Sequence, residues 1–300
     1  MKKSLTRKLT IAVIALVFAV VSLSTSTYAW FTMSNTAQVD AFKAEVKAGE
    51  GIEIAITEDG DASAAQWYTG NVPATVVTDV IGNMKFDAVT TNATNLVQAK
   101  FQYIEGENAE DDEWASFYIH IKTAQAGEVY LDSITLGSDA VSQWTVDKNY
   151  VKADGSDAQV NDTLTYEVAN AARIAFIYKD ASNNDVYKVY ENDNEVGADG
   201  AEKNTLGNTN NNGALSYYNN KNSYTAENGK LKTAPTENAY VINQIGDLST
   251  DVKLGETQGN TYITVRVLIW VEGWDAECIN AIFAQKLLTS INFLYKEVNA

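Results

Sequence analysis

The stretch Tyr262–Glu272, YITVRVLIWVE, is the clearest indication of the fold, because branched, aromatic and other apolar residues dominate it. Such a run, free of glycine and proline, is typical of a β-strand. Shorter stretches elsewhere alternate between apolar and polar residues, as in Ile52–Thr57 and in 117–122, which is the pattern of a half-buried strand. We expect further strands in 97–104, 127–136, 173–178, 186–190 and 287–295.

Helical periodicity is scarce in this sequence. The best case is 276–286, where Ile279, Ile282 and Phe283 recur at helical spacing behind Asp275, a possible N-cap. Many strands separated by turn residues, with one short helix, predict an all-β fold. We expect an antiparallel β-sandwich, jelly-roll-like or immunoglobulin-like, with one short C-terminal connecting helix.

The N-terminus has the three regions of a signal peptide. Four basic residues fall within the first eight, an apolar run fills 9–21, and small and polar residues lead to Ala29. The apolar run has thirteen residues, fewer than the roughly 20 that span a bilayer core. We predict a signal-peptide helix in 1–29, cleaved between Ala29 and Trp30, and a secreted, extracellular or cell-surface protein. The alternative is an uncleaved N-terminal anchor.

Charge and composition describe the chain that follows the signal peptide. Removing 1–29 takes away four of the 22 basic residues and none of the 39 acidic ones, which leaves a formal charge of −21. Such a charge repels phosphate backbones and anionic lipids, so we expect neither nucleic acid nor membrane as a partner. We predict one sandwich domain in 30–300, with a polar Asn-, Gly- and Tyr-rich insertion at about 191–238.

The residue types that carry most catalytic chemistry are rare. His120 is the only histidine, which excludes an HExxH zinc site and makes a serine triad improbable, and it should face solvent from a strand. Cys278 is the only cysteine and is expected to be a small buried apolar residue. We therefore predict a protein that is not an enzyme and has no cofactor or metal site. Clustered acidic residues in 105–113, 154–157 and 192–195 suit Ca²⁺, but none matches a calcium-binding loop motif, so solvated acidic loops are the favoured interpretation.

Two segments resemble a known family. Residues 26–32, STYAWFT, followed by 39–46, VDAFKAEV, are similar to the signal and mature start of Firmicutes proteins processed by the SipW-type signal peptidase, the TasA/camelysin group. Residues 265–278, VRVLIWVEGWDAEC, resemble a W-x-E-G-x-D-x-x-C signature near the C-terminus of related secreted proteins. That motif comprises Trp270, Glu272, Gly273, Trp274, Asp275 and Cys278.

The resemblance implies a jelly-roll subunit of a biofilm matrix, in which an N-terminal segment of one subunit completes the sheet of the next. The donor segment would have Trp30, Phe31, Val39 and Phe42 as apolar anchors. The alternative is that this segment pairs within its own subunit. The metalloprotease activity described for camelysin members is not expected, because the sequence has no matching metal motif. The C-terminal motif also has a plain structural interpretation, with the tryptophans capping the sandwich and the two acidic residues holding backbone.

The sequence thus predicts a non-enzymatic structural protein of the cell surface or extracellular matrix, which self-associates or joins other matrix subunits and polymerises by N-terminal strand donation. Its 16 tyrosines and 6 tryptophans leave open a second function, a secreted module that binds carbohydrate or a host ligand. A hydrolase of unrecognised type is a third, less favoured hypothesis.

Overall fold

The computed structural model describes 41–49, 51–82, 84–91, 101–103, 109–110, 113–146, 150–151, 157–192, 242–245, 248, 252–259, 261–275, 277–278 and 280–298. The chain divides into two units, Met1–Ala37 and Gln38–Ala300, and all of the described residues belong to the second. The signal-peptide segment, its cleavage site and most of the insertion predicted at 191–238 therefore lie outside the described residues.

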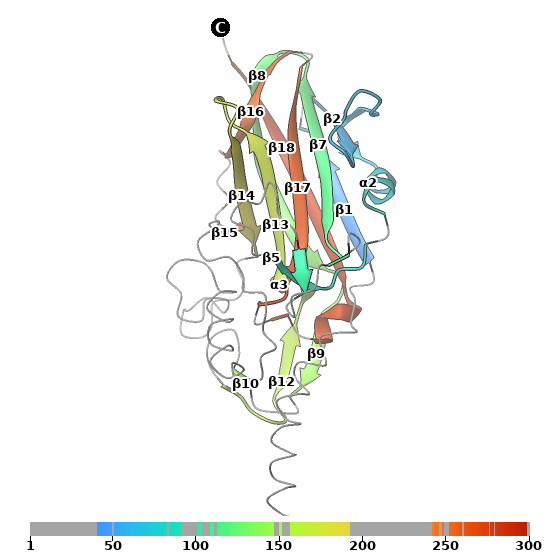
Figure 1. The fold of residues 1–300 in the computed structure, drawn as a ribbon, viewed down its shortest axis with the longest axis vertical. Coiled ribbons are helices and arrows are strands. Elements are labelled where there is room, and N and C mark those ends of the chain that lie inside the picture. Colours follow the sequence, from blue (N-terminus) through green and yellow to red (C-terminus); the bar gives the residue numbers. More distant parts are fainter. Residues whose placement is uncertain are drawn as a thin grey trace, which may run out of the picture. The chain divides into compact units, whose positions relative to one another are not determined.

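Two β-sheets make up the body of the second unit (Figure 1). The five-stranded sheet has the order β16 (Val252–Gln258), β8 (Ala126–Ser138), β18 (Lys286–Glu297), β1 (Ala41–Lys47) and β4 (Asn71–Val72). Its neighbours are antiparallel except for β1 and β18, which run parallel.

The nine-stranded sheet follows the path β15 (Ile242–Gln244), β14 (Asp185–Glu191), β13 (Ala172–Lys179), β17 (Tyr262–Glu272), β7 (Ala115–Thr123), β2 (Ile52–Thr57) and β3 (Tyr68–Thr69). Off this path, β5 (Ala88–Thr91) pairs with the end of β17, and β6 (Phe101–Tyr103) pairs with β5. The all-β sandwich prediction is confirmed, and β17 has the bounds expected from the sequence.

The side chains of β17 show which face of the nine-stranded sheet meets the other sheet. Gly255 on β16 lies directly against Ile263, and a hydrogen bond joins the hydroxyls of Thr123 on β7 and Thr257 on β16. Odd-numbered side chains of β7 and β17 therefore point into the sandwich, and even-numbered ones point away. The interior is apolar and fully buried; it includes Phe117, Ile119, Val265, Val267, Leu131 and Ile291.

One edge of the sandwich is covered by two short strands, one in each sheet, and by a helix. β3 covers the edge of β2, and β4, on the other side of Gly70, covers the edge of β1. Behind Pro73, α2 (Ala74–Ile81) packs against β1, β2 and β7 and buries Val77 (Figure 1). α2 is not predicted from the sequence, because the β-branched residues of ATVVTDVI have weak helical preference.

A small extension made of two short antiparallel strand pairs follows the end of β8. β9 (Ser142–Thr145) pairs with β12 (Thr163–Tyr166), and β10 (Tyr150–Val151) pairs with β11 (Asp157–Ala158). Val146 and Ala158 form its small core. The chain then returns through α3 (Val168–Ala171), a single helical turn, into β13.

The short connecting helix predicted at 276–286 is present, but it is shorter than expected and of the 3₁₀ type. The structure has a 3₁₀ helix, η4 (Asn280–Ala284), followed directly by β18. The Asp275 side chain, expected to cap a longer helix, accepts a hydrogen bond from the Glu277 backbone and binds an arginine instead. Ile282 and Phe283 are nevertheless buried, as their spacing predicts.

Candidate functional site

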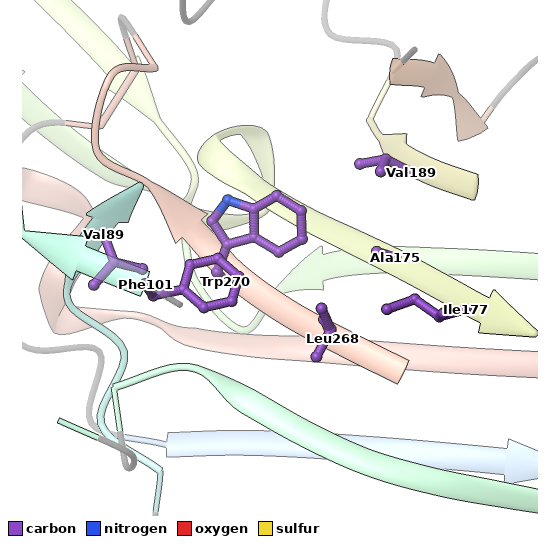
Figure 2. Close-up of a cluster of buried hydrophobic side chains, with 7 residues drawn as sticks. All are labelled: Val89, Phe101, Ala175, Ile177, Val189, Leu268 and Trp270. Atoms are coloured by element: carbon purple, nitrogen blue, oxygen red, sulfur yellow. The ribbon is translucent and has the colours of Figure 1, made fainter. Parts of the chain in front are cut away.

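The C-terminal motif lies where β17 ends and the chain turns towards η4. Trp270 points away from the five-stranded sheet, yet it is fully buried because β5 and β6 cover this part of the outer face. Figure 2 shows Trp270 beside Val89 and Phe101, with Leu268 and Ala175 further along the same face. The ring centroids of Phe101 and Trp270 are 5.2 Å apart.

The motif residues hold one another and the turn backbone. The indole N–H of Trp270 donates to Glu272 at 3.1 Å, and the Trp274 backbone N–H donates to the same carboxylate at 3.2 Å. Asp275 accepts from the Glu277 backbone N–H at 2.8 Å. Glu272 and Asp275 thus hold turn backbone, as the plain structural interpretation expects, whereas Trp270 packs under β5 and β6 instead of capping the end of the sandwich.

At the centre of the motif is a residue that the sequence analysis did not single out, Arg173. It is the cross-strand partner of Trp270 on β13, and its side chain is 1% exposed. One guanidinium nitrogen lies 2.7 Å from Asp275 and 2.7 Å from Glu191 at the end of β14. A second nitrogen donates to the Ala172 carbonyl at 3.2 Å. Arg173 therefore ties the C-terminal turn to β13 and β14.

The electrostatics of this cluster keep Arg173 positively charged. Burial alone would lower the pKa of Arg173, but the carboxylates of Glu191, Asp275 and Glu272 raise it above its ordinary value. Burial raises the pKa of Glu272 and of Asp275, and the positive charge of Arg173 opposes both shifts. Arg173, Glu191 and Asp275 are buried, and the guanidinium group already binds both carboxylates. We therefore infer that this cluster stabilises the fold, and we call it the structural lock.

Cys278, the last motif residue, has no environment for nucleophilic chemistry. Burial of the sulfur is the main reason why the pKa of this thiol lies well above its ordinary value, and the negative charge of Asp275 nearby raises it further. The thiolate is the reactive form of cysteine, so it is disfavoured here. Within the described ranges, no group of three or more His, Cys, Asp or Glu side chains could hold a metal ion. The acidic loops at 105–113, 154–157 and 192–195 lie mostly outside those ranges.

Of the predicted donor residues, only Phe42 falls in the described part of the chain; Trp30, Phe31 and Val39 lie outside it, as does the Ala29 cleavage position. Phe42 belongs to β1, where its backbone lies opposite Leu287 of β18. All seven residues of β1 pair with β18 of the same chain. On its other side, β1 pairs with β4 only at Val46 and Lys47.

The prediction that His120 faces solvent is wrong. The side chain does point away from the sandwich interior, but it is fully buried, with Tyr262 packed edge-on at 5.5 Å between ring centroids. Both ring nitrogens lie at hydrogen-bond distance from hydroxyls, 2.8 Å to Thr57 and 3.0 Å to Thr264. His120 therefore links β7 to its neighbours β2 and β17.

The position of His120 predicts how stability depends on pH. Burial lowers its pKa from the ordinary value of 6.5, and the negative charges of Asp59 and Asp61 oppose this shift only in part. The folded state thus favours neutral His120. Its contribution to stability is present above the unfolded-state pKa and is lost as pH falls through the lower folded-state pKa.

We expect the melting temperature of the wild type to fall more between about pH 7 and about pH 5 than that of His120→Asn. Parallel pH profiles for the two proteins would contradict this assignment.

No family model, curated protein or solved structure matches the chain. In the part of the chain that the structure describes, no helix has both the length and the apolar character needed to cross a membrane.

Proposed function

We propose that this chain is a secreted structural protein of the cell surface or extracellular matrix, which polymerises when β1 of one copy pairs with β18 of the next. The observation that supports this most is the position of β1. It is the first described strand, and its seven-residue ladder with β18 joins opposite ends of the chain.

Backbone pairing explains how the same strand could serve a monomer or a polymer. If β1 leaves β18, the N–H and C=O groups of β18 along 286–292 lose their partners and form an exposed sheet edge. The β1 strand of a second copy restores the same hydrogen bonds in the same register, so the exchange costs little free energy. A head-to-tail exchange that does not close into a ring gives an open filament.

The described chemistry of the chain favours this structural role over hydrolysis. His120 is enclosed by two threonines and Tyr262, and the pKa of Cys278 is raised by burial. The acidic residues of the C-terminal motif bind backbone N–H groups and Arg173. These groups stabilise the fold, and their arrangement leaves them poorly placed to attack a substrate.

A disulfide that locks β1 in place tests the proposal. Lys43 and Leu288 are register partners, so Lys43→Cys/Leu288→Cys in a Cys278→Ser background should cross-link β1 to its own β18. For the chain beginning at Trp30, we expect filaments in electron microscopy from the parent, monomers from the oxidised variant, and filaments again after reduction.

The matched control carries the same number of cysteines on a pair that does not involve β1. Ser133 and Asn292 are register partners on β8 and β18, and their side chains are hydrogen-bonded at 2.6 Å. Oxidised Ser133→Cys/Asn292→Cys in the same Cys278→Ser background should polymerise like the parent. Filaments from the oxidised β1 variant, or a parent that stays monomeric at all concentrations, would refute strand exchange.

A further inference from the structure

The outer face of the nine-stranded sheet carries a group of aromatic side chains that the structural role does not use. Tyr262 on β17, Lys122 on β7 and Glu53 on β2 are register partners in one row across three strands. Trp67, directly before β3, lies beside this row, with its ring centroid 5.9 Å from that of Tyr262. We call these four residues the outer aromatic patch.

We propose that the outer aromatic patch binds neutral sugar rings. Tyr262 is 49% exposed and is the one aromatic residue among the large apolar side chains exposed in the described ranges. The planes of Trp67 and Tyr262 are inclined by 52°, so the two rings do not stack on each other. Aromatic faces present apolar area against which the C–H face of a sugar packs, while polar groups beside them bind its hydroxyls.

The patch is held in a fixed arrangement before any ligand arrives. The Tyr262 ring packs edge-on against His120, which is held by the hydroxyls of Thr57 on β2 and Thr264 on β17. The Lys122 ammonium lies 4.2 Å from the Trp67 ring centroid and 2.7 Å from the Glu53 carboxylate. A binding surface whose side chains are already ordered loses little conformational entropy when a ligand binds.

The charge of the chain and of the outer aromatic patch indicates which class of ligand the patch binds. The full chain has a formal charge of −17, which disfavours phosphates and acidic polysaccharides. Within the patch, Lys122 and Glu53 neutralise each other, and Glu53 remains 43% exposed as an acceptor for hydroxyl groups. A neutral carbohydrate fits a locally neutral patch on an acidic protein. Two rings on one sheet face also offer far less area than a stable protein partner requires.

Titration with neutral oligosaccharides tests this inference independently of polymerisation. The full mature chain would be titrated by calorimetry with hexasaccharides of glucose, N-acetylglucosamine, mannose and xylose. We expect at least one to bind, and we expect Tyr262→Ala and Trp67→Ala each to weaken that binding about tenfold or more. Tyr262→Phe keeps the ring and should bind like the parent.

Tyr130→Ala is the matched control, because the Lys296 ammonium lies 4.2 Å from the Tyr130 ring centroid on β8 of the other sheet. It should leave the affinity unchanged, and melting curves would confirm that every variant is folded. Three results would overturn the proposal: no binding of any of the four hexasaccharides, an equal loss in Tyr130→Ala, or a sedimentation change in Tyr262→Ala without sugar binding. The last of these would assign the patch to contacts between copies of this chain.

Discussion

Replacement of Arg173 by methionine is expected to lower the free energy of unfolding by about 3–5 kcal/mol, as urea denaturation followed by circular dichroism would measure. The substitution removes the positive charge that lies 2.7 Å from both Glu191 and Asp275 and leaves their carboxylates buried without it. Methionine retains much of the side-chain volume, so the loss reports mainly on charge.

Two further variants separate this effect from an ordinary loss of an ion pair. Lys179 and Asp185 form a pair at 2.8 Å whose lysine is largely exposed, so Lys179→Met should cost less than about 1 kcal/mol. Neutralising the carboxylates as well, in Arg173→Met/Glu191→Gln/Asp275→Asn, should recover part of the lost stability. An Arg173→Met protein as stable as Lys179→Met would show that the cluster is not a structural lock.

Trp270→Ala is expected to cost about 3–5 kcal/mol in the same measurement. The side chain is fully buried between the sheet and the β5–β6 cover, so truncation leaves a cavity beside Phe101 and Val89. It also removes the indole N–H that donates to Glu272. Glu272 also accepts a hydrogen bond from the Trp274 backbone N–H. We therefore expect Trp270→Ala to destabilise the turn after β17 as well.

Trp270→Phe distinguishes the two parts of this effect. Phenylalanine fills much of the volume but donates no hydrogen bond, so a loss of about 1–3 kcal/mol is expected from the lost hydrogen bond to Glu272 and the smaller ring together. If Trp270→Ala were no more destabilising than Trp270→Phe, then packing of Trp270 against Phe101 would not be what holds β5 and β6 on the outer face of the sheet.

Periodicity was a sound guide to the strands of the sandwich. The alternation in 117–122 correctly assigns Phe117, Ile119 and Ile121 to the interior, and Tyr262–Glu272 forms a central strand with its predicted bounds. Periodicity could not reveal which outward-facing residues are covered by other segments. His120 has the predicted orientation, yet Tyr262 encloses it.

The motif residues were recognised from the sequence, but their shared partner was not. Arg173 is the one charge in 172–178, ARIAFIY, the part of β13 in which every residue is buried. A charge in such a strand requires a buried counter-charge, and that reasoning could have identified Arg173. Its partners could not have been named, because Glu191 and Asp275 are distant in sequence and only the fold brings them together.

The pairing of β1 with β18 has a consequence for the timing of folding. Ala41 and Lys286 are register partners, so the first described strand must wait until Lys286 has been synthesised, on the order of tens of seconds after Ala41 at cellular rates. Closing so long a loop is slow and costs entropy, whereas capture of a β1 strand from another copy becomes faster as the protein concentration rises. The ratio of closed monomers to linked chains should therefore depend on how quickly the protein is produced.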